Sequence, residues 1–382
     1  MRISYLIIIS FSILFSSCNQ NNKKVKDNQA QNKKTEKLDS LYTDLFNQNK
    51  FNGNVLIAED GKILLKKSYG LADAETKVDL NENSIFELAS VSKQFTAMGI
   101  VQLVKEGKIN YGDDIRKYIP ELSFYNKITI ENLLYHTSGL PDYIDLADLY
   151  WDKEKIANND DIVKLFELHK PELFFETNSD YEYSNTGYLL LATIIERTSD
   201  LNYQDYLKNK VFIPSNMKST LVLRKRYEPK EMKNIAIGYL YSDSLKTKVK
   251  PDNLTDYKFV TYLDGVVGDG MVNSTTQDLY NWDRVLRNEK IINQTDKERI
   301  FQPYKFFDSI PTGYGYGWYI IEDEKFGKYV KHSGGWPGYV AHIERHLDTD
   351  KTIIILQNLM LESPLIPLKN TRNILYNLPL DD

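Results

Sequence analysis

Three short clusters of residues, far apart in the chain, carry the functional groups of an acyl-transfer site. Ser90-x-x-Lys93 places a hydroxyl and an amine one helical turn apart, and Tyr183-x-Asn185 brings a phenol and a carboxamide. The third cluster, residues 332–335, combines a histidine and a serine with two glycines. A serine that attacks a carbonyl needs a base, a proton shuttle and an oxyanion hole. The three clusters together could supply these parts, although none of them means much alone.

The first cluster is informative because of its position, since Ser-x-x-Lys occurs again at Ser215 and Lys218. The strand-like run 221–223 follows that second copy, whereas Ser90 opens a long segment that is predicted to be helical, with Lys93 on the same face. Free N–H groups at a helix N-terminus favour developing negative charge. A lysine amine, with a pKa of about 10.4, must be desolvated or placed beside a cation to act as a base. The alternative is an N-cap serine and a solvated lysine.

The second cluster offers a proton carrier and a binding group. The phenol of Tyr183 can pass a proton if a nearby ammonium lowers its pKa. The carboxamide of Asn185 can hold the lysine amine and a substrate carbonyl at the same time. The alternative is a loop with a buried tyrosine and a capping asparagine before a helix that begins near Tyr188.

The third cluster consists of His332, Ser333, Gly334 and Gly335 on a predicted edge strand. Glycines there let the backbone of a substrate approach closely. The N–H of Gly335 could be the second donor of an oxyanion hole, with the N–H of Ser90 as the first. The alternative is a glycine-rich turn with a structural histidine.

The order and rough spacing of these clusters resemble the serine β-lactamase and penicillin-binding-protein superfamily, whose class A members carry the Ser-x-x-Lys signature. The Tyr-x-Asn form is similar to the class C branch and to related D,D-carboxypeptidases, esterases and D-aminopeptidases. Residues 128–141, 268–279 and 314–318 also resemble sequences of this superfamily. The resemblance covers essentially all of residues 39–380.

The resemblance implies a role for each residue of the first two clusters. Ser90 is the nucleophile, and Lys93 and Tyr183 share the roles of base and acid. Which of the two deprotonates Ser90 stays open. Asn185 positions the substrate.

For the third cluster, the resemblance implies that Gly335 completes the oxyanion hole and that Ser333 and Gly334 belong to the strand that binds substrate. His332 departs from the pattern, because β-lactamases and transpeptidases usually have a lysine there. A histidine favours the broader hydrolase branch over an efficient β-lactamase. No metal and no cofactor are expected.

The predicted function is therefore that of a serine hydrolase that forms an acyl-enzyme with an ester, a D-amino-acid peptide or a related amide. One alternative is a penicillin-binding D,D-carboxypeptidase or a weak β-lactamase. A second alternative is a catalytically inactive lipoprotein that only binds fragments of the cell wall.

One other segment suggests a different chemistry. Residues 342–346 resemble the helix of a zinc protease, but the glutamate comes one place too late for that motif. The segment also alternates like a strand. It predicts a surface strand, and no metal site.

The elements that position the clusters follow from hydrophobic patterning. Asp60-Gly61 between two β-rich runs predicts a hairpin, and residues 317–321, 329–333, 339–346 and 352–356 predict further strands near the other end. The segments between are mostly helical, including 95–104, 130–135, 162–168 and 188–195. We therefore expect an α+β fold: one antiparallel sheet built from both chain ends, flanked by helices, with a mostly helical lobe inserted and a cleft between them.

The first residues have the pattern of an export signal: a positive charge at Arg2, an apolar run over 6–15, and small residues before Cys18, the only cysteine. The order resembles a bacterial lipobox, although Phe15 stands where leucine is usual. We expect a lipoprotein signal peptide over 1–18 with lipidation at Cys18. The alternative is a plain signal peptide with an incidental cysteine.

The polar residues 19–38 then predict a disordered tether, and residues 39–382 the hydrolase domain. The expected location is the cell envelope, with the protein lipid-anchored on the periplasmic or cell-surface side of a bacterial membrane. A formal net charge of −5 over 382 residues gives no indication of a nucleic-acid partner.

Overall fold

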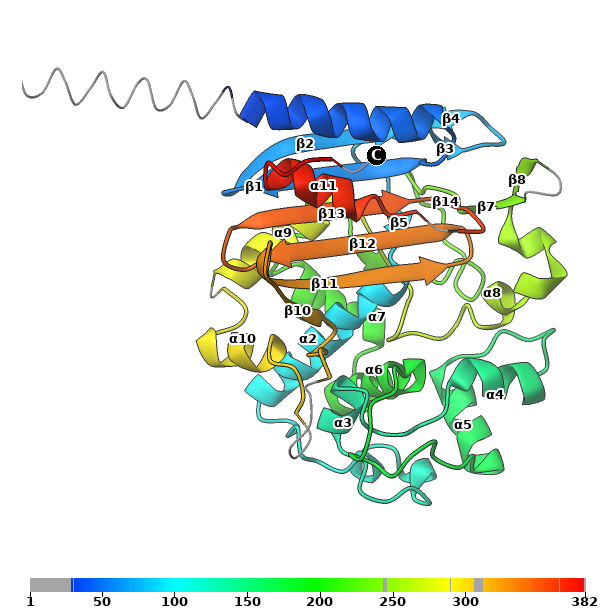
Figure 1. Cartoon of the computed structure of the whole chain (residues 1–382). Coiled ribbons are helices and arrows are strands. Elements are labelled where there is room, and N and C mark those ends of the chain that lie inside the picture. Colours follow the sequence, from blue (N-terminus) through cyan, green and yellow to red (C-terminus); the bar gives the residue numbers. More distant parts are fainter. Residues whose placement is uncertain are drawn as a thin grey trace, which may run out of the picture.

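The computed structural model describes residues 29, 31–242, 246–288, 290–305, 312–363 and 365–380. Its central element is an antiparallel sheet with the strand order β10-β11-β12-β13-β1-β2 (Figure 1). The strands are β1 (Gly53–Glu59), β2 (Lys62–Tyr69), β10 (Tyr319–Asp323), β11 (Gly327–Trp336), β12 (Tyr339–His346) and β13 (Lys351–Gln357).

The two ends of the chain meet in the middle of this sheet, as the sequence predicted. β1 pairs with β13 along its whole length, from Gly53 opposite Gln357 to Glu59 opposite Lys351. The predicted hairpin joins β1 to β2, and both turn residues have positive φ, 52° at Asp60 and 73° at Gly61. Such backbone angles favour Asp-Gly in a tight turn.

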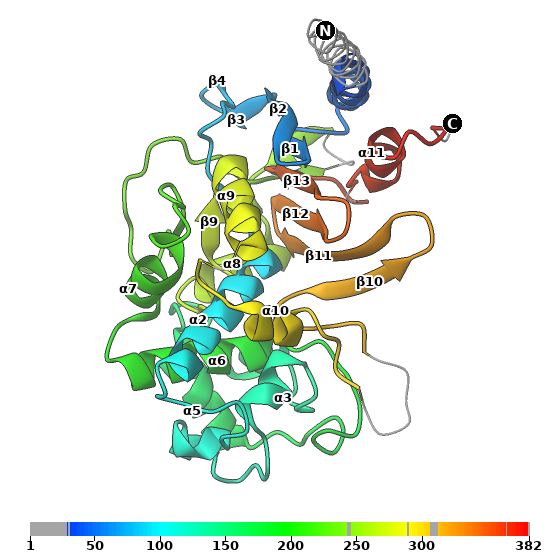
Figure 2. The same cartoon turned by 90° about the vertical axis from the view of Figure 1, so that its left-hand side faces the viewer.

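The outer face of the sheet is covered by an N-terminal helix over residues 31–47 and by α11 (Leu368–Leu375), which lie on the same side of the sheet (Figure 2). Leu38 and Tyr42 of the first helix pack with Ile355 of β13 and Ile374 of α11 in one hydrophobic cluster. Burial of these apolar side chains holds both chain ends against the sheet.

The N-terminal helix corrects one prediction, because residues 31–38 were expected in the disordered tether. Lys34 lies 2.8 Å from both carboxylate oxygens of Glu59, and Leu38 is fully buried. These two residues are four places apart and therefore share a helix face, which the polar composition of the segment concealed. The predicted signal peptide over 1–18, its Cys18, and tether residues 19–28 lie outside the described residues.

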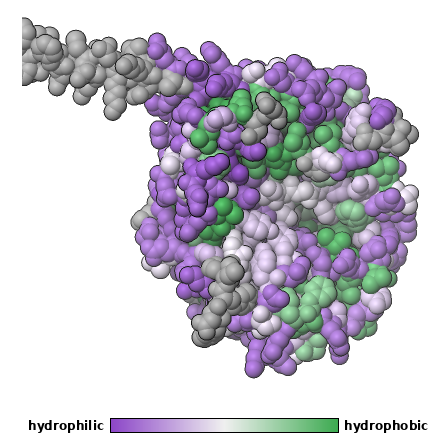
Figure 3. Space-filling model, viewed as in Figure 1, coloured by the Kyte–Doolittle hydropathy of each residue, from purple (hydrophilic) through white to green (hydrophobic). Residues whose placement is uncertain are grey.

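The other face of the sheet carries the helical part of the molecule, which extends into a lobe below the sheet in Figure 1. Figure 3 shows a largely hydrophilic surface with separate hydrophobic patches, one just below the N-terminal helix and others over the lobe. The helices are α2 (Lys93–Lys105), α3 (Ile130–Leu134), α4 (Tyr143–Tyr150), α5 (Asn159–His169), α6 (Asn185–Ser199), α7 (Tyr203–Leu207), α8 (Phe259–Tyr262), α9 (Thr276–Arg287) and α10 (Gln294–Ile300).

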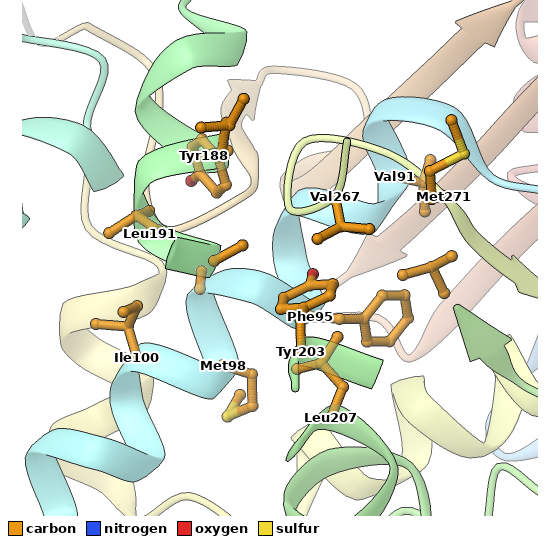
Figure 4. Packing of buried hydrophobic residues seen from close by; sticks show 14 of the residues in the cluster. Val91, Phe95, Met98, Ile100, Tyr188, Leu191, Tyr203, Leu207, Val267 and Met271 are labelled. Carbon is orange, nitrogen blue, oxygen red and sulfur yellow. The ribbon is translucent and has the colours of Figure 1, made fainter. Parts of the chain in front are cut away.

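Helix α2 runs through the centre of this core. Figure 4 shows Phe95, Met98 and Ile100 of α2 among residues of α6 and α7. Gly99 lets the helices approach closely, since an added Cβ would lie 2.8 Å from Cδ1 of Ile195 on α6. This packing fixes the start of α2 relative to the start of α6.

Short strands complete the fold. A three-stranded sheet with the order β5-β9-β6 ties the segment before Ser90 to the segment after Asp269: the amide of Leu88 donates to the carbonyl of Val272 over 2.8 Å. The short strands are β3 (Leu71–Asp73), β4 (Val78–Asp79), β5 (Phe86–Glu87), β6 (Leu221–Val222), β7 (Tyr239–Ser242), β8 (Thr247–Val249), β9 (Val272–Ser274) and β14 (Leu359–Met360).

The fold is α+β, as predicted. A search of the described residues for a helix long and apolar enough to cross a bilayer found none.

Candidate active site

Ser90 lies in a short 3₁₀ turn, η1 (Ala89–Ser92), and the α-helix that the sequence predicted to open at Ser90 begins only at Lys93. Side chains three residues apart eclipse one another in a 3₁₀ turn, which places the Lys93 amine 3.2 Å from the Ser90 hydroxyl. Ala89 before it has a φ of 47°, a left-handed conformation that costs free energy for a residue with a Cβ. The first turn also leaves the Ser90 N–H without an acceptor inside the helix.

The amine of Lys93 is the centre of the site. Its side chain has no exposed surface, and it donates to the Asn185 carboxamide over 2.9 Å and to the backbone carbonyl of Asp269 over 3.0 Å, besides the bond to Ser90. Burial lowers the pKa of Lys93 to about 8, against the opposing charges of Asp269 and Asp142. The ammonium form therefore uses all three of its N–H groups within the protein.

Tyr183 comes from the loop before α6 and places its ring beside this amine. The distance from the Lys93 nitrogen to the ring centroid is 4.9 Å. Burial raises the pKa of Tyr183 well above its usual value, and the nearby Ser90 hydroxyl only partly opposes this. The phenol oxygen makes no well-formed hydrogen bond within the described part of the chain. Tyr183 is thus a neutral phenol near pH 7, and its pKa is not lowered as the sequence analysis required of a proton carrier.

His136 positions the Tyr183 loop, a role that the sequence analysis did not assign. Its Nδ1 accepts a hydrogen bond of 3.1 Å from the amide of Ser184, and its ring centroid lies 4.4 Å from that of Tyr183. The hydroxyl of Ser184 then caps α6 by accepting from the amide of Gly187. Asn185, the first residue of that helix, consequently faces Lys93.

Strand β11 approaches the site with its second half. The sequence predicted an edge strand, but β10 covers β11 from Gly327 to Lys331, so only residues 332–336 have an open edge. The backbone N–H and C=O groups of the even-numbered residues of β11 point toward β12, as the bond from the Leu347 amide to the Lys328 carbonyl shows. The pattern alternates along an antiparallel pair, so the N–H of Gly335 points to the open edge.

Gly334 brings this strand into contact with the turn that carries Ser90. An added Cβ would stand 2.1 Å from the Leu88 carbonyl oxygen and 3.0 Å from the Ser90 nitrogen. No side chain fits there. The absence of one lets the N–H groups of Ser90 and Gly335 border the same cavity, which is the arrangement an oxyanion hole requires.

His332 faces the interior on the same side of the sheet. Its Nδ1 donates to the carbonyl of Ser333 over 2.7 Å, so Nε2 accepts from the phenol of Tyr314 over 3.0 Å. Burial lowers the pKa of His332 to about 3, and the charge of Lys93 adds to the effect. The imidazole is neutral near pH 7, so it cannot pair with a carboxylate as a lysine at this position would.

Ser333 points to the opposite, outer face and does not line the cavity at Ser90. Its hydroxyl lies 2.8 Å from Nδ1 of His342, which is joined through Glu344 to His346 and to Arg372 of α11. β12, which the sequence placed at the surface, is an internal strand with every residue buried. His342, Glu344 and His346 bind one another and Arg372 on the face that α11 covers, whereas Arg345 pairs with Asp283 of α9 over 2.6 Å.

A cavity of about 130 Å³ opens beside Ser90. Three carboxylates that the sequence analysis did not assign to the site lie in or next to its lining. Asp142 accepts from the Asn185 carboxamide over 2.8 Å, and Asp269 and Glu87 line the cavity. The sequence contained a signal for two of these carboxylates. Asp269 lies within the family-like stretch 268–279, and Asp142 directly follows the family-like stretch 128–141. The remaining lining residues are Ala89, Tyr143, Ile144, Asn185, Leu263, Val266, Gly270, Met271, Gly335 and Trp336.

The chain is similar to known proteins along most of its length. A family model described as Beta-lactamase matches residues 38–376. The chain is 41% identical over 350 residues to Penicillin-binding protein 4* of Bacillus subtilis (strain 168), which covers 91% of this chain and 77% of that protein.

Two solved structures share the fold. A penicillin binding protein from Bacillus halodurans has a TM-score of 0.71 at 24% identity and covers 83% of this chain and 94% of its own. A D-amino acid amidase from Ochrobactrum anthropi SV3, solved with D-phenylalanine, has a TM-score of 0.73 at 23% identity and covers 92% of this chain and 99% of its own.

The contact at Gly334 leads to a prediction about Ser90. We expect Gly334→Ala to slow the labelling of Ser90 by a fluorophosphonate by about 100-fold, since a displacement of about 1 Å in such a site has that effect. Labelling is followed by intact-protein mass. Gly112→Ala is the matched control, because its added Cβ meets nothing within 4 Å. Equal labelling rates in a folded Gly334→Ala protein would mean that the strand does not set the position of Ser90.

Proposed function

The chain belongs to the Beta-lactamase family, and from this premise we propose that it is a serine hydrolase that forms an acyl-enzyme on Ser90. The substrate class is an ester, a D-amino-acid peptide or a related amide. The observation that carries the proposal is the desolvated amine of Lys93, 3.2 Å from the Ser90 hydroxyl and with its pKa lowered to about 8. A base is most effective when its pKa lies near the working pH.

In the proposed first step, the Ser90 oxygen attacks the carbonyl carbon and its proton moves to the neutral amine of Lys93. The N–H groups of Ser90 and Gly335 stabilise the negative charge that develops on the carbonyl oxygen. Asn185, whose carboxamide oxygen already holds the amine, keeps Lys93 directed at Ser90.

In the second step, the tetrahedral intermediate collapses and the leaving group departs with a proton. Tyr183 is suited to deliver it, because the phenol is neutral and its ring centroid lies 4.9 Å from the Lys93 amine. The phenol regains its proton from Lys93. Water then hydrolyses the acyl-enzyme by the same proton transfers in reverse.

A second candidate is a penicillin-binding D,D-carboxypeptidase or a weak β-lactamase. The 41% identity to a protein named as a penicillin-binding protein favours it. The neutral His332 argues against it, because substrates of that kind carry a carboxylate that a cation would bind. A third candidate, an inactive protein that binds wall fragments, is opposed by the complete set of reactive groups around Lys93.

The intact mass of the protein after exposure to a fluorophosphonate and, separately, to a penicillin distinguishes the three candidates. We expect a fluorophosphonate to add one adduct to the protein, and Ser90→Ala to abolish it while the fold is retained. A long-lived penicilloyl adduct would instead support the second candidate. Absence of any adduct on folded protein would support the third and overturn the proposed function.

The lowered pKa of Lys93 predicts the pH dependence of acylation. The neutral amine is the base, so the acylation rate should rise about tenfold per pH unit below the pKa and become constant above it, with the midpoint at about 8. Stopped-flow acylation by a chromogenic ester measures it. Tyr183→Phe should lower the rate without moving the midpoint. A midpoint that disappears in Tyr183→Phe would assign the base to the phenol.

We also propose that Cys18 is lipidated and anchors the protein in the cell envelope. The proposal rests on the export signal that precedes the single cysteine of the chain. Metabolic labelling with an alkyne fatty acid should mark the wild-type protein in the membrane fraction, and Cys18→Ala should lose both the label and the membrane association. A labelled Cys18→Ala protein would contradict the assignment.

A further inference from the structure

The cavity beside Ser90 has an unusual balance of charge for a site expected to receive a substrate. Two carboxylates, Glu87 and Asp269, line it, and no arginine or lysine is among its described lining residues. The nearest ammonium, that of Lys93, directs its three hydrogen bonds to Ser90, Asn185 and the Asp269 carbonyl. Apart from the two N–H groups of the oxyanion hole, the described lining therefore offers carboxylates for a cation and no charged side chain for an anion.

Asp269 is one of the residues that line this space, and hydrogen bonds hold it in place. Its backbone carbonyl is fixed by the bond to Lys93, and one carboxylate oxygen accepts from the phenol of Tyr143 over 3.1 Å. Burial raises the pKa of Asp269, which shows that its charge is incompletely compensated within the protein. A positive group in the cavity would supply the missing compensation.

Glu87, the last residue of β5, is the second carboxylate in the lining. The residue is only 7% exposed, yet its nearest described cation, Lys225, stands 3.7 Å away. Lys225 also gives its own hydrogen bond to the phenol of Tyr339 over 2.8 Å. Burial raises the pKa of Glu87, and this ion pair with Lys225 opposes the shift only in part. Glu87 is thus a second acceptor for a cation that enters beside Ser90.

The other walls limit what can carry that cation. Ile144, Leu263, Val266, Met271 and Trp336 are apolar, and the cavity holds only about 130 Å³. A small acyl group with one positive charge fits these surroundings. A carboxylate in the same space would meet two like charges in a partly desolvated setting, where repulsion is strong.

We infer that the acyl group accepted by this site carries a free primary ammonium, which Asp269 and Glu87 bind, so that the substrates are aminoacyl esters or amides with an unblocked amino group. This inference rests on the proposed function and specifies its substrate class. It places the charged group on the acyl side, between Ser90 and Trp336. The neutral His332 is consistent with a substrate that presents no carboxylate to β11.

Three forms of alanine 4-nitrophenyl ester test the inference: the ester with a free amine, the N-acetyl ester and the N-succinyl ester. Each form is made from D-alanine and from L-alanine. We expect kcat/KM to fall about tenfold or more from the free amine to the acetyl ester, an effect typical of a partly desolvated charge pair. The succinyl ester, which adds a negative charge, should be the poorest substrate. Higher salt should reduce the preference.

Two isosteric variants locate the effect. Asp269→Asn and Glu87→Gln should each reduce the ratio of free-amine to acetyl kcat/KM, and the double variant should bring it close to one. Asp145→Asn is the matched control, because that carboxylate is an exposed residue of α4 outside the cavity lining and should leave the ratio unchanged. The ratio compares two substrates on one protein, so a general loss of activity does not affect it.

The outcomes distinguish this inference from the proposed function. If a fluorophosphonate labels Ser90 and the free-amine esters are hydrolysed no faster than the acetyl esters, the hydrolase remains and the ammonium subsite is overturned. A preference that survives in the double variant would likewise overturn the assignment to Asp269 and Glu87. If the fluorophosphonate fails to label Ser90, the proposed function itself fails.

Discussion

A lysine amine without contact with water is the point on which the site depends. Lys93 makes three hydrogen bonds, to Ser90 in its own turn, to Asn185 at the start of α6, and to the Asp269 carbonyl before β9. Desolvation of a charged amine costs several kcal/mol unless partners are in place. The three segments must therefore close around the amine together. The same burial that makes the site costly to form lowers the pKa of Lys93 into the range useful for proton transfer.

The rest of the fold serves to bring those segments to one place. The pairing of β1 with β13 joins the two chain ends, and thereby sets β11 beside the turn that carries Ser90. The short β5-β9 pairing holds the turn against the Asp269 loop. Packing of α2 on α6, which the small Gly99 permits, fixes the Asn185 side. Each of these contacts joins parts of the chain that are distant in sequence, so loss of one would displace a single partner of Lys93.

The parts of this structure that local sequence specifies were predicted well. Asp60-Gly61 marked its hairpin because few other dipeptides accept two positive φ angles, and the alternating run 339–346 coincides with β12. The motif positions also indicated which groups meet, because the Lys93 amine contacts the Ser90 hydroxyl and the Asn185 carboxamide. What could not be predicted depends on contacts across the fold. Nothing local in the polar segment 31–38 shows that Lys34 meets Glu59, and the role of His136 arises only from its bond to Ser184.

The assignment of Ser333 failed for a related reason, which also clarifies how the site selects charge. In a strand, adjacent side chains point to opposite faces, so if His332 and Gly334 face the nucleophile, Ser333 cannot. Its hydroxyl instead joins His342 and Glu344 on the face covered by α11. The strand therefore brings the N–H of Gly335 and no cation to the cavity, and the nearby imidazole of His332 is neutral. Because β11 contributes no charge, the charge preference of the site depends on Asp269 and Glu87, which line the cavity.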